Sequence, residues 1–206
     1  MDVFHSEGLQ YRSFSSPEDD DFFHSMQGDP VTFTNSCVSL TRPVDRRFTK
    51  NIRKHLTENS LLFVVIYRTP DYSVNSVLPR NRVTPVFHRN RVQPEPERIG
   101  IMFLKSASPD MAHHRCSECG IDMKKQYRSQ YGDLAIKWML DWAFRSANLH
   151  RVECTVFGWN TGILKIYKSV GFFEEGKRRE CLFKDDKWWD EVHFGILKEE
   201  WQLIRQ

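Results

Sequence analysis

The chain of 206 residues lacks the long apolar run of a membrane protein. No stretch approaches the roughly 18 consecutive apolar residues that suggest a membrane-spanning helix. Its first ten residues, MDVFHSEGLQ, have neither the basic start nor the apolar segment of a secretion signal. Internal repeats are also absent. Together these absences predict a soluble, cytoplasmic protein that does not associate with membranes.

Cysteine is sparse, and the five cysteines form an odd, scattered set. A chain of this length can build a core without cross-links, so we expect free thiols in a reducing compartment. An excess of one charge is lacking too, because 30 Lys and Arg residues are interspersed with 27 Asp and Glu residues to give a net charge of +3. This balance predicts no nucleic-acid partner and leaves small anionic ligands open.

What is present is an alternation of helix and strand patterns, which predicts one domain over residues 1–206. "SLLFVVIYR" (60–68) is a near-continuous apolar run, typical of a strand buried on both faces. Residues 41–59 have apolar side chains at every fourth position and are predicted to form a helix. Residues 69–98 contain five prolines and no period, and we expect an irregular insertion there.

The second half has a regular order of patterns: strand, strand, helix, strand, helix and hairpin. The first helix is expected over residues 133–148. The second, "NTGILKIYKSVG" (160–171), ends at a glycine. The hairpin pairs 172–183 with 188–201 through the polar turn "KDDK".

Three segments carry a family resemblance: "NLHRVECTVFGWN", "IYKSVGFFEEGKRRE" and "DDKWWDEVHFGILKEEW". In order and spacing they resemble the GNAT superfamily of acyl-CoA N-acyltransferases, nearest to its ribosomal-protein N-terminal and spermidine acetyltransferases. The likeness spans about 99–201. It implies a single-domain α/β (α+β) fold with a mixed, V-splayed central sheet flanked by helices. It also implies transfer of an acetyl group from acetyl-CoA to a primary amine, with no metal.

The resemblance assigns the cofactor to a splayed pair of strands and to the helix that follows. The main chain of Ile121, Asp122 and Met123 would hydrogen-bond the pantetheine arm like an extra strand. Backbone amides of a loop over 127–133 would bind the diphosphate at a helix N-terminus. The expected binding residues in this loop are Arg128, Ser129, Gln130, Tyr131, Gly132 and Asp133.

This loop departs from the family's glycine pattern. One of the two glycine positions has no glycine here, although glycine permits a close approach of the backbone to phosphate. The carboxylate of Asp133 would repel a diphosphate beside it. Ile163 replaces a small residue near the cofactor. We therefore expect weakened cofactor binding, and these departures also motivate a non-catalytic acyl-CoA-binding protein as the alternative.

The resemblance assigns Tyr167 as the general acid that protonates the departing thiolate and as a cofactor contact; a tyrosine that only packs in the core is the other reading. Asn160 matches a cofactor-contacting asparagine and is also suited to cap the following helix. Glu118 is the candidate general base, equally compatible with a solvated or salt-bridged side chain. Asp122 and His114 are weaker candidates for that role.

Two rival interpretations remain. "HHRCSEC" (113–119) brings histidines and cysteines together, but zinc sites commonly need a second, distant ligand pair, which the chain lacks. The basic segment 80–91 suits an acidic partner or a solvated loop. The predicted acceptor is a small-molecule amine or a peptide N-terminus, with a slight preference for the small molecule, and the protein is predicted to be a monomer or homodimer.

Overall fold

The computed structural model describes residues 3–69 and 95–205. Most of the predicted insertion (69–98), including the basic segment 80–91, lies outside the described residues. The described strands form one sheet in the order β1-β2-β3-β4-β5-β6-β8-β7, in which only β5 and β6 are parallel. The strands are β1 (His5–Ser6), β2 (Leu9–Ser13), β3 (Ser60–Arg68), β4 (Glu97–Lys105), β5 (Cys116–Met123), β6 (Arg151–Phe157), β7 (Phe173–Lys184) and β8 (Lys187–Leu197).

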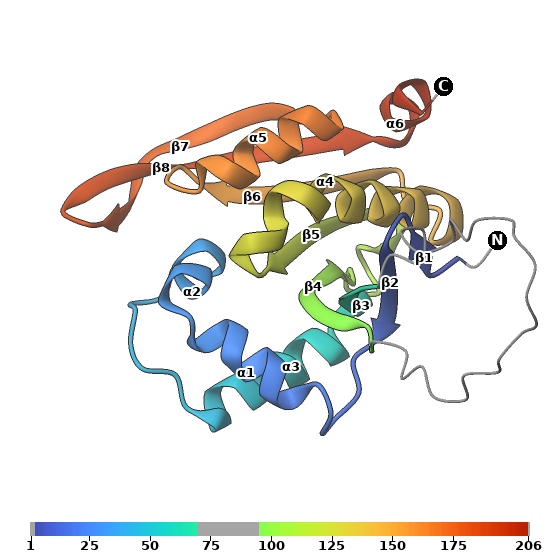
Figure 1. Ribbon diagram of the computed structural model, residues 1–206. Coiled ribbons are helices and arrows are strands. Elements are labelled where there is room, and N and C mark those ends of the chain that lie inside the picture. The colour runs from blue at the N-terminus through green and yellow to red at the C-terminus, as the bar shows by residue number, and fades with distance from the viewer. Residues whose placement is uncertain (1–2, 70–94, 206) are drawn as a thin grey trace, which may run out of the picture.

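Helices cover both faces of this sheet (Figure 1). They are α1 (Asp20–Gly28), α2 (Pro30–Ser36), α3 (Arg46–Glu58), α4 (Lys125–Asp141), α5 (Thr161–Val170) and α6 (Lys198–Ile204). In Figure 1, α1, α2 and α3 lie together on one side, and α4 and α5 lie on the other. The mixed single-domain α/β architecture predicted from the sequence is confirmed.

Strand β3 shows why the sheet is covered on both faces. Val64 and Ile66 belong to the main core beside α4, whereas Val65 and Tyr67 pack with Phe23 of α1 on the opposite face. Successive side chains of a strand point to opposite faces, so a continuous apolar run requires two apolar surroundings.

The parallel strands β5 and β6 diverge along their length. Their residues pair only from Cys116↔Arg151 to Glu118↔Glu153, and no pairing follows, although both strands continue for several residues. The other edge of β5 stays paired with β4 as far as Met123. The predicted V-shaped opening therefore lies between the C-terminal halves of β5 and β6, where main-chain groups of β5 have no strand partner.

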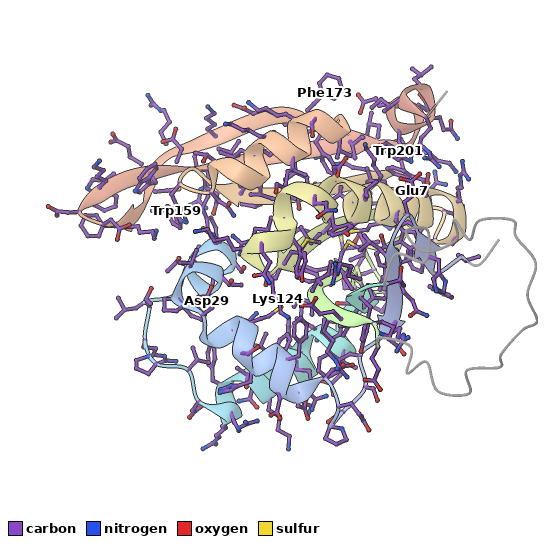
Figure 2. The ribbon with its side chains drawn as sticks, viewed as in Figure 1. Glu7, Asp29, Lys124, Trp159, Phe173 and Trp201 are labelled. Atoms are coloured by element: carbon purple, nitrogen blue, oxygen red, sulfur yellow. The ribbon has the colours of Figure 1, made fainter. Side chains whose placement is uncertain are left out.

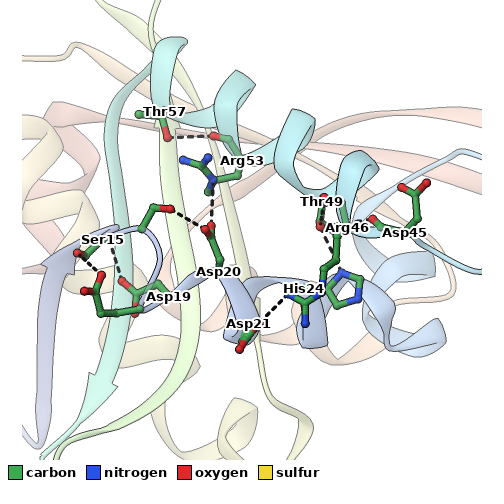
Figure 3. A network of polar contacts seen from close by, with 12 residues as sticks. Ser15, Asp19, Asp20, Asp21, His24, Asp45, Arg46, Thr49, Arg53 and Thr57 are labelled. Atoms are coloured by element: carbon green, nitrogen blue, oxygen red, sulfur yellow. Dashed lines mark hydrogen bonds and ion pairs between the residues drawn. The ribbon is translucent and has the colours of Figure 1, made fainter.

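Polar contacts join α1 to α3 beneath the sheet (Figure 3). Arg46 pairs with Asp21 at 2.6 Å and Arg53 with Asp20 at 3.2 Å, and His24 hydrogen-bonds the hydroxyl of Thr49 at 3.2 Å. These contacts hold α1 beside α3, and α2 follows α1 after a single residue.

Three predicted boundaries are wrong. The helix predicted over 133–148 begins at Lys125 and continues after Asp141 as a π-helical turn over Trp142–Ser146. The second strand of the hairpin ends at Leu197 rather than at residue 201, because α6 begins there and buries Trp201. The helix predicted over 41–59 begins at Arg46, where the Asp45 side chain caps it.

Helix α2 was not predicted, although its sequence carries a start signal. Asp29 accepts a hydrogen bond from the amide of Thr32, and Pro30 occupies the first helical position. Asp at the N-cap followed by Pro is a standard helix opening. At seven residues the helix is too short to show a periodic apolar face, so its pattern was missed.

Candidate active site

Two adjoining cavities open at the splayed strands. The outer cavity, of about 700 Å³, lies between the end of β5, the first turns of α4 and α5, and helix α2. The inner cavity, of about 120 Å³, lies between β5 and β6 and reaches Tyr167. The residues that line both cavities are Asn35, Ile121, Asp122, Asn160 and Ile163.

The outer cavity has a strongly cationic wall. Lys125 and Arg128 of α4, Lys165 of α5 and Lys184 of the hairpin line it, against the single carboxylate of Asp122. Several cations around one concave surface attract a ligand with several negative charges. A coenzyme bearing a diphosphate therefore fits this charge pattern.

Several of the predicted cofactor residues meet at the outer cavity. Ile121, Asp122 and Met123 line it from β5, and Arg128, Ser129 and Gly132 line it from α4. Gln130 and Tyr131 do not line it: Gln130 is exposed, and Tyr131 is buried in the core. A Cβ on Gly132 would lie 3.0 Å from Ile166 Cδ1, so this glycine permits close packing of α4 on α5.

The predicted diphosphate loop over 127–133 is instead helical. Helix α4 begins at Lys125, directly after β5, and the amide of Tyr127 already donates to the carbonyl of Lys124. From the second turn onward, helix amides are used within the helix, so only the first turn offers free donors. Gly132 is the single glycine of this segment, which contains no proline, so its side chains permit a helix.

Asp133 has different surroundings from those expected. Its carboxylate pairs with Lys137 at 3.1 Å, one turn further along α4, and it does not line either cavity. We therefore expect Asp133→Thr to leave the Kd for acetyl-CoA unchanged within about twofold, because a solvent-screened charge outside the cavity contributes little. Isothermal calorimetry on both proteins measures this, and clearly tighter binding by the variant would show that Asp133 faces the ligand.

Tyr167 lies at the inner end of the two cavities. Its side chain is 3% exposed, and its hydroxyl lies 3.9 Å from Cys119 Sγ. Burial, with smaller contributions from Cys119 and Cys154, raises the pKa of the Tyr167 phenol well above its usual value. The phenol therefore keeps its proton at neutral pH, which a proton donor requires.

Asn160 occupies the N-cap position of α5, but its side chain makes no capping hydrogen bond there. The backbone carbonyl of Asn160 accepts a hydrogen bond from the amide of Leu164. The side chain lines both cavities. Its amide group is thus placed to contact a ligand.

The acidic candidates on β5 differ in their partners. Glu118 lines the inner cavity, is partly exposed and forms an ion pair with Lys105 Nζ at 2.6 Å. Asp122 lines both cavities, and burial raises the pKa of its carboxyl. His114, an exposed residue in a turn before β5, lines neither cavity. Among residues 3–69 and 95–205, no three His, Cys, Asp or Glu side chains are arranged to hold a metal ion.

Sequence reasoning missed helix α2 and therefore its contribution to the site. Asn35 and Ser36, at the end of α2, line the inner cavity, and Trp159 Nε1 donates to the carbonyl of Thr34 at 3.1 Å. Figure 2 shows Trp159 where the hairpin side of the molecule meets α2. The Asp-Pro start of α2 was a usable signal, but nothing in the sequence paired α2 with Trp159.

The comparisons with known proteins agree with this geometry. Residues 9–173 match the family described as "Acetyltransferase (GNAT) domain". The chain belongs to this GNAT family. The uncharacterized N-acetyltransferase YnaD of Bacillus subtilis (strain 168) is 33% identical over 85 residues, which cover 41% of this chain and 50% of YnaD. The uncharacterized N-acetyltransferase p20 of Bacillus licheniformis is 29% identical over 86 residues, covering 41% and 48%. The chain thus spans about half the length of these curated relatives.

Solved structures share the GNAT fold over nearly the whole chain. Spermidine N-acetyltransferase from Vibrio cholerae, in complex with CoA and spermine, has a TM-score of 0.72 at 18% identity, covering 96% of this chain and 99% of the other. A GNAT-family acetyltransferase from Bacillus anthracis has a TM-score of 0.67 at 17% identity, covering 95% and 98%. At this identity the likeness establishes the fold. Within the described residues, no helix is both long and apolar enough to cross a membrane.

Proposed function

We propose that this protein transfers the acetyl group of acetyl-CoA to a primary amine. The observation that carries the proposal is the buried Tyr167 hydroxyl in the inner cavity between the diverging strands β5 and β6, which adjoins the cation-lined outer cavity. Membership of the GNAT family supports the same reaction. Acetyl-CoA supplies an acetyl thioester, and the ammonium form of the amine becomes an amide while a thiol and one proton are released.

Different residues of the two cavities bind the coenzyme and donate the proton. Lys125, Arg128 and Lys165 hold the anionic end of the coenzyme, and unpaired main-chain groups of β5 orient its arm. Tyr167 holds a proton for the thiol that leaves. Asn160 contacts the coenzyme near the junction of the cavities.

The acceptor is a small amine rather than a protein N-terminus. The inner cavity has a volume of only about 120 Å³. The end of α2 lines one side of it and is held by the hydrogen bond from Trp159 to Thr34. A slender aliphatic amine fits this space better than a folded polypeptide end. The Vibrio cholerae relative, described as a spermidine N-acetyltransferase, agrees with a small acceptor.

One observation favours a second candidate, a GNAT protein that binds acyl-CoA without turnover. Because α4 begins at Lys125, fewer backbone amides are available for a diphosphate than in a glycine-rich loop. The two functions are separated by measuring acetyl-CoA binding by calorimetry and thiol release across a panel of amines. Binding with amine-dependent thiol release supports the enzyme, binding without release supports the second candidate, and no binding refutes both.

The cationic wall gives a quantitative prediction. Lys165→Gln should raise the Kd for acetyl-CoA by up to about fivefold, corresponding to about 1 kcal/mol or less for an exposed charge pair. The effect should shrink at high ionic strength. Lys168→Gln is the matched control, because Lys168 lies on the same helix, pairs with Glu174 and lines neither cavity. Equal effects of the two substitutions would contradict the assignment.

A further inference from the structure

Asp122 faces the acceptor side of the splayed strands. On β5, Cys119 and Met123 belong to the core beside α4, so the alternation of side chains points Asp122 to the opposite face, toward α1 and α2. Its two hydrogen-bonding partners, Gln27 and Ser36, come from those helices. Asp122 also lies beyond Glu118, where pairing with β6 ends.

The two hydrogen-bonding partners of the Asp122 carboxylate are both neutral. Ser36 Oγ donates a short hydrogen bond to Oδ1, and Gln27 Nε2 donates to Oδ2 at 3.5 Å. Among the described residues, no Lys, Arg or His nitrogen forms an ion pair with it within 4.0 Å. The guanidinium of Arg128 donates instead to the carbonyl of Met123 at 2.7 Å and to Thr32 Oγ1 at 3.2 Å. A partly buried carboxylate without a cationic partner, in the wall of a cavity, suits a cationic ligand.

Glu118 is less suited to this role. Its carboxylate already binds the ammonium of Lys105 at 2.6 Å, and a substrate ammonium would have to displace that lysine. Glu118 also lines only the inner cavity, whereas Asp122 lies where the inner and outer cavities meet. An amine in the inner cavity can therefore reach Asp122 beside a coenzyme that enters from the outer cavity.

We propose that the carboxylate of Asp122 binds the ammonium group of the acceptor and takes its proton, so that the acceptor is a primary alkylamine that is charged at neutral pH. The inference rests on the proposed function. One N–H bond of the ammonium breaks, the proton passes to a carboxylate oxygen of Asp122, and the nitrogen keeps the electron pair. Asp122 later returns this proton to solvent.

The surroundings of Asp122 suit a base. Burial raises the pKa of its carboxyl, and the hydrogen bond from Ser36, the charge of Arg128 and the hydrogen bond from Gln27 oppose that rise. A raised pKa brings the carboxylate closer in basicity to the ammonium. The titratable or charged groups that share its cavities are Glu118 and Cys119 of β5, Tyr167 of α5, Arg128 and Lys125 of α4, Lys165 of α5 and Lys184 of the hairpin.

The test compares Asp122→Asn with Glu118→Gln, the same chemical change on the same face of the same strand. Thiol release from acetyl-CoA is measured between pH 6 and pH 10 with butylamine, 1,4-diaminobutane, spermidine, glucosamine and alanine amide. With the best acceptor at pH 7, Asp122→Asn should lower kcat/KM by about 100-fold or more, as expected for loss of a general base. Glu118→Gln should have an effect at least about tenfold smaller.

The pH dependence separates a base from a structural carboxylate. A base must be ionised, so wild-type activity falls as the pH drops through the pKa of Asp122. As the pH rises toward the pKa of the amine, the substrate loses its proton to water, and the deficit of Asp122→Asn should shrink. A structural defect would leave the deficit constant. Asp122→Glu should restore part of the activity.

Folding and cofactor binding are monitored separately. Thermal unfolding and calorimetry with acetyl-CoA should give nearly the same values for wild type and Asp122→Asn. Glu153→Gln, on β6 and outside both cavities, should match wild type in every measurement. If wild type acetylates an amine while Asp122→Asn keeps its rate or shows a deficit that does not vary with pH, the inference fails and the proposed function stands. If wild type acetylates none of the five amines, both fail.

Discussion

Replacing Tyr167 with phenylalanine should lower kcat by about 100-fold or more while leaving the Kd for acetyl-CoA within about threefold, since general acids typically contribute 10²–10⁴-fold. The substitution removes only the hydroxyl. The ring contacts with Phe172 and Phe194, at centroid distances of 4.9 and 6.2 Å, remain available. The hydroxyl has thiol neighbours and no strong hydrogen-bond partner among the described residues, so little stability should be lost with it.

The matched control for this prediction is Tyr131→Phe. Tyr131 is also a mostly buried helical tyrosine, 9% exposed, but it lines neither cavity. Its substitution should leave kcat unchanged. Steady-state thiol release and calorimetry with acetyl-CoA measure the two effects. Full activity of Tyr167→Phe would refute the role of Tyr167 as proton donor and would indicate that this residue only packs in the core.

Replacing Asp19 with alanine should lower the free energy of unfolding by about 3 kcal/mol, near the lower end of the range for breaking a buried charge pair. Asp19 is 1% exposed and accepts hydrogen bonds from the Ser15 amide at 2.9 Å, the Tyr67 hydroxyl at 2.9 Å and Arg98 Nε at 2.6 Å. These bonds tie the start of α1 to β3 and β4. Without Asp19, the Tyr67 hydroxyl is left buried without its acceptor.

The neighbouring carboxylate provides the control for Asp19. Asp20 pairs with Arg53 at 3.2 Å near the surface, and its side chain is 37% exposed, so Asp20→Ala should cost less than about 1 kcal/mol. Denaturant unfolding at pH 7 measures the loss of unfolding free energy in both variants. In thermal unfolding, the Asp19 variant should melt about 6–12 °C below wild type. Similar losses for the two variants would show that burial does not distinguish them. Because α1 and α2 support the acceptor side, the Asp19 variant should also lose activity at lower temperature than wild type.

The predictable parts of the fold follow from local patterns. The buried strand over 60–68 was predicted at its observed bounds, because a β-branched apolar run flanked by polar residues is typical of a buried strand and of few other structures. The hairpin turn was also correct: Asp185 and Asp186 both have positive φ, as the tight turn of a hairpin requires. Helix α2 was missed because it is short, and the start of α4 was misplaced because two local patterns conflict there. In the segment before Gly132, the family resemblance predicted a loop, while the side chains themselves permit helix.

The candidate site divides in the same way. Tyr167, Asn160 and the β5 segment 121–123 could be predicted because they lie at fixed spacings along the chain. The partners of Asp122 could not, because Ser36 is 86 residues away in sequence and comes from a helix that the sequence analysis did not find. The ion pair between Glu118 and Lys105 also depends on how β4 and β5 pair.

The sequence by itself determined the alternation of elements, the two-sided apolar sheet, the GNAT motifs and Tyr167, since each depends on residues close together in the chain. The tertiary structure decided the partners of the two carboxylates on β5, since Glu118 pairs with Lys105 and Asp122 bonds Ser36 and Gln27. It also decided that α4 starts one residue after β5, that Asp133 pairs with Lys137 outside the cavities, and that α2 lines both cavities. Those outcomes depend on which distant segments pack together, and packing is set by the whole core rather than by any one stretch of sequence.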